Sequence, residues 1–247
     1  MPSLFVRVIA GSLLLAGCCA TLPLPAQQLP KRSLPELINT QEPGWELVSS
    51  WLKAAKNQVQ VLPKSPARAD STLLAAQVTT RSPMGAIIYE TGGILVDNGW
   101  LRILGSGSPA LNRNLMSWNQ GKPPGMLLVA DDVLGGFYAI NGGAFGPETL
   151  GKVFYLAPDN LEWEATNKTY TEFLLFCFSG DLAGYYKNLR WPGWQQEVRM
   201  LTGSQGLACL PFLFTKAGKN VAKVKRGAVP IAELWTFAQD MKRRLDK

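Results

Sequence analysis

Two adjacent aspartates, Asp131 and Asp132, stand between an apolar run and a double-glycine turn in the stretch LLVADDVLGGFYAIN. Paired carboxylates can hold Ca²⁺ or Mg²⁺, or act as acid and base in hydrolysis. Adjacent residues of an extended chain point to opposite faces, however, so the two side chains cannot easily share a reacting atom. A hard-metal loop would also alternate its ligands, and this stretch does not. We interpret the pair as a strand-ending turn, in which Asp binds backbone amides while Gly135 and Gly136 take positive φ. No metal site is predicted.

A second pair of carboxylates, Glu90 and Asp97, flanks the Gly92-Gly93 turn. Together they could serve as an acid and a base, although carboxylates are also common beside hairpin turns. The chain contains no histidine, which excludes Ser-His-Asp and Cys-His catalysis and histidine-ligated metals. Only carboxylate, Lys, Tyr, Ser/Thr or Cys chemistry remains open, and we expect no cofactor.

Two further stretches could bind a ligand. In QVTTRSPMG, Arg81 and Ser82 could clamp a carboxylate or phosphate; the structural alternative is a helix-to-strand connection. In LRWPGW, Trp191 and Trp194 could form an aromatic shelf for a sugar or a protein partner. The alternative for the tryptophans is packing against the last helices.

The net charge of +7 is concentrated near the C-terminus. Residues 215–247 contain nine Lys and Arg against three Asp and Glu, a local net charge of +6. This excess favours an anionic partner, such as a membrane surface or an acidic protein, or else a solvated tail. The sequence has no stripe of basic residues interleaved with aromatic ones, so it does not indicate a nucleic-acid partner.

The order of elements predicts an α+β fold. Residues 33–57 are predicted to form two short helices, and residues 65–80 another helical stretch. Residues 85–109 alternate apolar runs with Gly-Gly and Asn-Gly turns, which predicts three short antiparallel strands. A polar loop (108–125) precedes three more strands, MLLVA, FYAIN and KVFYLAP. A helix capped by Thr171 follows, then a short helix at WPGWQQEVRML, an extended GLACLPFLF and a final amphipathic helix after Pro230. The result is an antiparallel sheet of about six strands flanked by helices in a single domain, residues 34–247.

The N-terminus is predicted to be an export signal. Arg7 precedes an apolar run that is too short to span a bilayer, and Leu15-Ala16-Gly17-Cys18 resembles the bacterial lipobox. We therefore expect a signal peptide over residues 1–18 with lipidation at Cys18, and a proline-rich tether over 19–33. The alternatives are ordinary cleavage near Ala20 or Ala26, or an unprocessed N-terminal helix. In an exported protein Cys177 and Cys209 could form a disulfide, but two buried thiols fit their apolar runs equally well.

Two family resemblances follow from these motifs. The chain resembles the central block of the SUKH (Smi1/Knr4-like) superfamily in two stretches, LLVADDVLGGFYAIN and GKVFYLAPDNLEWEATNKTYTEFLLF. The matching positions are Asp131, Asp132, Gly136, Tyr138, Val153, Tyr155, Trp163, Phe173 and Leu174. The chain also resembles an uncharacterised bacterial family, the domain of unknown function numbered 2625. The matching stretches are LINTQEPGWELVSSWLKAAKNQVQVLP, residues 73–107, LRWPGW and PFLFT. The SUKH resemblance implies an immunity-type domain that binds a toxin.

The sequence therefore leads to two main hypotheses, with a purely structural envelope lipoprotein as a third. The first is a non-enzymatic protein-binding domain at the cell envelope, anchored through Cys18 as an outer-membrane lipoprotein or free in the periplasm, with a cytoplasmic location as the alternative. The second is a carboxylate-dependent hydrolase of a cell-envelope or sugar substrate. It requires Glu90, Asp97, Asp131 and Asp132 to converge in one cleft.

Overall fold

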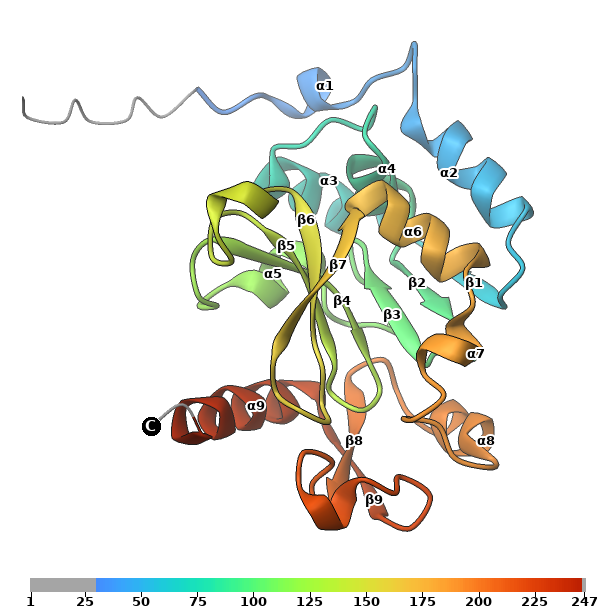
Figure 1. Cartoon of the computed structure of the whole chain (residues 1–247). Coiled ribbons are helices and arrows are strands. Elements are labelled where there is room, and N and C mark those ends of the chain that lie inside the picture. The colour runs from blue at the N-terminus through green and yellow to red at the C-terminus, as the bar shows by residue number, and fades with distance from the viewer. Residues whose placement is uncertain (1–29, 246–247) are drawn as a thin grey trace, which may run out of the picture. The chain divides into compact units, whose positions relative to one another are not determined.

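The fold is α+β, as the sequence predicts, and is described by a computed structural model for residues 30–245 (Figure 1). From Arg32 onward the chain forms one compact unit. The predicted signal peptide, Cys18 and most of the tether lie outside the described residues.

A seven-stranded antiparallel sheet organises this unit, and each strand pairs with the next one along the chain. Its strands are β1 (Val59–Leu62), β2 (Gly93–Val96), β3 (Leu101–Leu104), β4 (Met126–Asp132), β5 (Phe137–Asn141), β6 (Lys152–Leu156) and β7 (Trp163–Thr169). A separate antiparallel pair is formed by β8 (Gln205–Leu210) and β9 (Lys225–Pro230). Strands that follow one another along the chain are usually neighbours in a sheet, and this holds here even where residues 63–92 separate β1 from β2.

Helices lie at both ends of the view in Figure 1. The described helices are α1 (Leu34–Leu37), α2 (Gly44–Lys53), α3 (Pro66–Ala76), α4 (Pro83–Glu90), α5 (Leu115–Asn119), α6 (Tyr170–Ser179), α7 (Leu182–Tyr185), α8 (Trp194–Arg199) and α9 (Ile231–Leu245), with 3₁₀ turns η1 (Pro147–Thr149) and η2 (Lys216–Gly218). α2 packs against α4 and α6. In Figure 1, α9 lies with β8 and β9 at the lower end of the view, away from that group.

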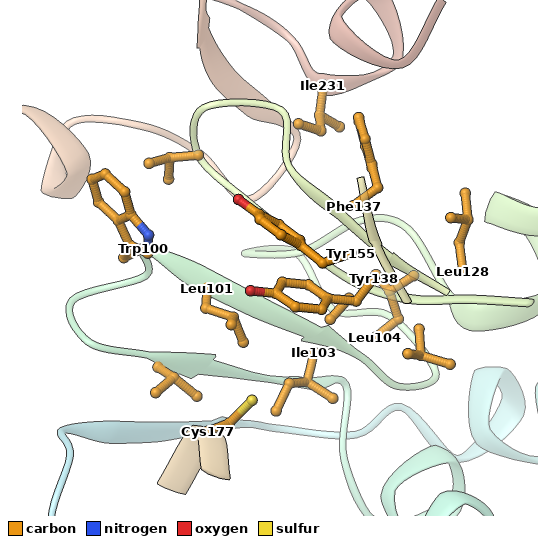
Figure 2. Packing of buried hydrophobic residues seen from close by; sticks show 14 of the residues in the cluster. Trp100, Leu101, Ile103, Leu104, Leu128, Phe137, Tyr138, Tyr155, Cys177 and Ile231 are labelled. Atoms are coloured by element: carbon orange, nitrogen blue, oxygen red, sulfur yellow. The ribbon is translucent and has the colours of Figure 1, made fainter. Parts of the chain in front are cut away.

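Alternation along β5 shows how the sheet separates two layers. The ring of Phe137 packs against Trp235 of α9, with centroids 5.0 Å apart, whereas the next residue, Tyr138, packs against Phe173 of α6 at 4.8 Å. Figure 2 shows the same division, with Ile231 beside Phe137 and Cys177 on the side of Ile103. Successive strand residues therefore serve different cores.

The predicted strand at the start of residues 85–109 is wrong, because this segment is helix α4. Pro83 occupies the first helical turn, and Ser82 Oγ accepts a hydrogen bond from the amide of Gly85 at 3.1 Å. Proline and a serine cap both favour a helix start here. A short apolar run such as AII fits a buried helix as well as a strand.

Several other elements differ from the prediction. The edge strands β1 and β7 and the short helix α5 were not predicted. The cap of α6 is Thr169 rather than Thr171, since Thr169 and Glu172 form a reciprocal capping box. β7 is polar and exposed along most of its length, so it lacks the hydrophobic alternation that marks a strand.

The two described cysteines are free and buried. Burial raises the pKa of the Cys177 thiol well above its usual value and raises that of Cys209 to about 11. Thiols with raised pKa values are poor nucleophiles at neutral pH. The sequence left open either a disulfide or two buried thiols, and the structure has two buried thiols.

Candidate functional site

Asp131 is the centre of a closed ionic network. Arg102 is its direct partner in the β3–β4 register, and Arg102 Nε donates to Asp131 Oδ1 at 2.6 Å. Arg113 Nη1 donates to Asp131 Oδ2 at 2.5 Å, and the guanidinium lies 4.6 Å from the ring of Trp118. All three charged side chains are buried. Burial also lowers the pKa of Arg102, while the charge of Asp131 opposes that shift.

The same arginines tie the sheet to the segment before β8. Arg102 donates to the carbonyl oxygens of Asp132 and Gln205, and Arg113 Nη2 donates to the carbonyl oxygen of Gly203 at 2.9 Å. Guanidinium groups suit this role because their five donors form a rigid fork. The network thus holds β3, β4 and the start of β8 together. The carboxylate of Asp131 does not face solvent.

Asp132 points to the opposite face from Asp131, as predicted from the alternation. Its Oδ1 accepts hydrogen bonds from the amides of Leu134 and Gly136, both at 2.9 Å, and its Oδ2 accepts one from Tyr155 Oη at 2.7 Å. Burial raises the pKa of Asp132, although these three hydrogen bonds oppose the shift. The turn prediction is confirmed for Asp132, which binds backbone amides.

The glycines of this turn have different roles. Gly135 adopts φ +81°, as predicted, but Gly136 is not among the residues with positive φ. A Cβ at Gly136 would collide with Asp132 Oδ2 and with Tyr155 Oη. Glycine is therefore required at position 136 for close approach rather than for a left-handed backbone.

The second carboxylate pair does not meet the first. Glu90 forms an ion pair with Lys64 at 2.7 Å, and Asp97 forms one with Arg190 at 2.6 Å. Asp97 lies in the β2–β3 turn with φ +53°. Each of the four carboxylates considered for hydrolysis has its own partners, and none of them lines the cavities beside α9 and α6.

Arg81 and Ser82 are adjacent but do different things. Arg81 extends into solvent and pairs with the equally exposed Glu42 at 2.7 Å. Ser82 caps α4 and donates its hydroxyl to the carbonyl oxygen of Thr79 at 2.9 Å. These contacts are structural, but the predicted helix-to-strand connection is wrong, because the segment joins helix α3 to helix α4.

The two tryptophans of LRWPGW are buried rather than displayed as a shelf. Trp194 packs edge-on against Trp100 with centroids 5.1 Å apart, and Trp191 lies 5.9 Å from the same ring. Arg190 is stacked over Trp194 at 4.2 Å and Trp100 at 4.8 Å. Cation–π contacts of this kind stabilise the core.

An open cavity lies elsewhere, between the β8–β9 pair and α9. It has a volume of about 200 Å³ and is called here the apolar groove. Its lining includes Leu134, Leu161, Phe212, Phe214, Val229 and Phe237. The three phenylalanine rings contact one another, with centroids 4.7 to 6.2 Å apart. Phe212 is 38% exposed and the neighbouring Leu210 is 60% exposed, so the groove presents apolar surface to solvent.

Two lysines lie near this groove without lining it. Lys219 Nζ donates to the carbonyl oxygen of Asp159, next to Pro158 in the groove wall, and Lys225 pairs in register with the exposed Leu210. Glu233, in the first turn of α9, is the carboxylate of the lining. The charged residue of the lining itself is therefore acidic, and lysines of the basic C-terminal segment lie nearby.

The sequence analysis did not select the groove residues. GLACLPFLF was predicted to be extended and buried, and β8 confirms the extended part. The exposure of its C-terminal end could not be predicted from the sequence, because Phe212 and Phe214 form an apolar surface only together with Phe237 of α9. The available signal was an apolar run followed by a cluster of lysines, which is typical of a binding surface.

Residues 30–245 contain neither a grouped metal site nor a membrane-spanning helix. Within that range no three His, Cys, Asp or Glu side chains group as a metal site. No helix of the described residues has the length and apolar character needed to cross a membrane.

Comparison with known proteins identifies related chains. The model of the family described as protein of unknown function DUF2625 matches residues 34–234. The uncharacterized protein YbfG of Escherichia coli (strain K12) is 41% identical over 215 residues, which cover 85% of this chain and 97% of YbfG. An uncharacterized protein of Haemophilus influenzae (strain ATCC 51907 / DSM 11121 / KW20 / Rd) is 44% identical over 189 residues, covering 74% and 82% of the two chains. The SUKH resemblance stays a prediction.

Proposed function

The chain belongs to the family of unknown function DUF2625, and we propose that it is a non-enzymatic binding domain of the cell envelope. Its partner is an amphipathic, acidic segment of another protein, which binds in the apolar groove. One observation carries this proposal. The groove exposes apolar side chains on a folded domain, whereas the carboxylates that could do chemistry are engaged in structural contacts.

The chemistry of the partner follows from the groove. Three phenylalanine rings offer an apolar floor, which suits the apolar face of a helix or strand. The described residues from 215 onward carry eight Lys and Arg against Glu233 and Asp240. Acidic residues beside the apolar ones would complement this positive charge and steer the encounter.

The hydrolase alternative has less support. Acid–base hydrolysis of a glycosidic bond needs two carboxyl groups that flank one scissile bond. Asp131 is neutralised by two buried arginines, and Glu90 and Asp97 each pair with a separate cation. No specific observation favours catalysis by this set.

The envelope location rests on the sequence of residues 1–33, as a lipid anchor at Cys18 and a proline-rich tether. An anchored domain of this type would meet its partner at the outer membrane or in the periplasm. In the SUKH superfamily that the chain resembles, immunity proteins bind toxins. A toxin segment is therefore one partner with the required chemistry.

The groove can be tested with 1-anilinonaphthalene-8-sulfonate, a probe that combines an apolar body with an anionic group. We expect saturable binding to the folded wild-type protein with enhanced fluorescence. The variant Phe212→Ser removes an aromatic wall and should weaken binding by about tenfold.

The matched control is Met200→Ser, because Met200 is 85% exposed and does not line the groove. It should bind the probe as the wild type does. Equal affinity in Phe212→Ser and wild type, with both proteins folded by circular dichroism, would overturn the assignment of the groove.

A further inference from the structure

A second cavity lies on the other face of the sheet, at its β7 edge. Tyr138, Tyr155 and Glu164 face one another across three strands, since Tyr155 is the register partner of both Tyr138 and Glu164. Register partners in adjacent strands lie on the same face. α6 lies beside β7 (Figure 1), and a space of about 230 Å³ remains between the sheet, α6 and α7. We call it the aromatic pocket.

Aromatic rings form most of its walls, from Tyr138, Tyr155, Phe173, Phe176 and Tyr185. Tyr138 and Tyr155 are stacked with centroids 4.5 Å apart, and Figure 2 shows both hydroxyls directed the same way. Those hydroxyls are occupied, since Tyr155 Oη donates to Asp132 and Tyr138 Oη lies 2.6 Å from Tyr186 Oη. The floor therefore offers ring surfaces rather than free hydroxyls.

Phe176 and Tyr185 complete the wall nearer to solvent. Their rings meet edge to face at 5.3 Å, and Tyr185 is 42% exposed. A large aromatic ring that stays half in water beside a cavity can receive the flat face of a ligand.

Two residues of β7 with opposite charges, Glu164 and Lys168, line this pocket. The strand contains a bulge between its pairings with Val153 and Phe154, and Asn167 in the bulge has φ +59°. The bulge separates Glu164 from Lys168, yet both side chains line the pocket. Bulges often re-aim side chains beside binding sites.

Neither charged group forms an ion pair in the part of the chain that the structure describes. Glu164 Oε1 accepts a hydrogen bond from Asn160, and Lys168 Nζ donates to the carbonyl oxygen of Thr166 at 3.3 Å. Lys168 Nζ also lies 5.2 Å from the ring centroid of Phe176. A carboxylate and an ammonium group are thus both available at an aromatic cavity.

We propose that the aromatic pocket binds a small zwitterion with a flat apolar body, in the chemical class of an aromatic amino acid. The apolar body lies against Tyr155, Phe176 and Tyr185; its ammonium group meets Glu164 and its carboxylate meets Lys168. The pocket is smaller than the roughly 300–1,000 Å³ of sites for drug-sized ligands, which limits the ligand to about this size. This site is separate from the apolar groove.

The test is calorimetry of the full-length protein with L-phenylalanine and two analogues that each keep one charge. 2-Phenylethylamine lacks the carboxylate, and 3-phenylpropionate lacks the ammonium group. We expect saturable binding of L-phenylalanine and about tenfold weaker binding of each analogue, because each loses one charge-assisted contact.

Two variants assign each charge to its residue. In Glu164→Gln, L-phenylalanine should bind no better than 3-phenylpropionate; in Lys168→Met, it should bind no better than 2-phenylethylamine. The controls Glu46→Gln and Lys187→Met change exposed residues that do not line the pocket and should bind as the wild type does.

Four results would overturn the proposal, and the first three concern L-phenylalanine and its analogues. They are no saturable binding of L-phenylalanine, equal affinity for all three compounds, or an unchanged ranking in both variants. Binding of a neutral hexose in place of L-phenylalanine would also contradict it. None of these results bears on the apolar groove, because the two cavities share no lining residue.

Discussion

Arg102 and Asp131 face each other across β3 and β4 as a buried ion pair, with side chains that are 2% and 0% exposed. Arg113 completes the network from the loop before α5. The two adjacent aspartates therefore have different structural roles. Asp131 neutralises two arginines, and Asp132 accepts hydrogen bonds from the backbone amides of a turn.

Removal of the charge of Asp131 should strongly destabilise the domain. The variant Asp131→Asn leaves two arginines buried without their counter-ion, which costs about 3–5 kcal/mol. Urea unfolding followed by circular dichroism measures this loss. The matched control Glu42→Gln breaks the exposed pair with Arg81 and should cost at most about 1 kcal/mol. A loss below 1 kcal/mol in Asp131→Asn would contradict a structural role.

Asp132 should give the domain a distinct pH dependence. Because its folded pKa is raised, the native state binds more protons than the unfolded state between the unfolded pKa, about 4, and the folded value. The contribution of Asp132 to stability therefore falls as pH rises through this window. Asp132→Asn removes this titration and keeps an acceptor for the amides of Leu134 and Gly136.

The measurement for Asp132 is the free energy of unfolding of both proteins from pH 4 to pH 7. Wild type should lose stability relative to Asp132→Asn as the pH rises. A difference that stays flat, or that grows in favour of wild type, would show that the folded pKa is not raised.

Local patterns in the sequence predicted what depends on local geometry. The alternation at Asp131 and Asp132 correctly placed the two carboxylates on opposite faces, and turn chemistry correctly assigned the amide contacts of Asp132. The partners of Asp131 could not be predicted, because Arg102 and Arg113 are 29 and 18 residues away and no local pattern marks their register.

The errors have similar physical causes. The apolar run in α4 satisfies both helical and extended patterns, so only the Ser82 cap and Pro83 distinguish them. β7 is a polar edge strand whose pairing depends on β6. The apolar groove depends on α9 packing beside Phe212 and Phe214, which is a tertiary relationship.

Processing at Cys18 can be tested independently of the fold. Intact mass of the protein from the membrane fraction should show loss of residues 1–17 and addition of acyl chains at Cys18. The variant Cys18→Ala should lose the acyl mass and leave the membrane fraction. A full-length, unmodified chain in the cytoplasm would contradict the envelope proposal and leave the apolar groove as an intracellular binding site.

The most direct test of the proposed function is photo-crosslinking in cells, with p-benzoylphenylalanine incorporated at position 212 and, as control, at position 200. We expect one discrete protein adduct from position 212, with a crosslinked segment that is acidic and amphipathic, and no such adduct from position 200. An adduct of equal yield from both positions, or none from position 212, would contradict the proposed function.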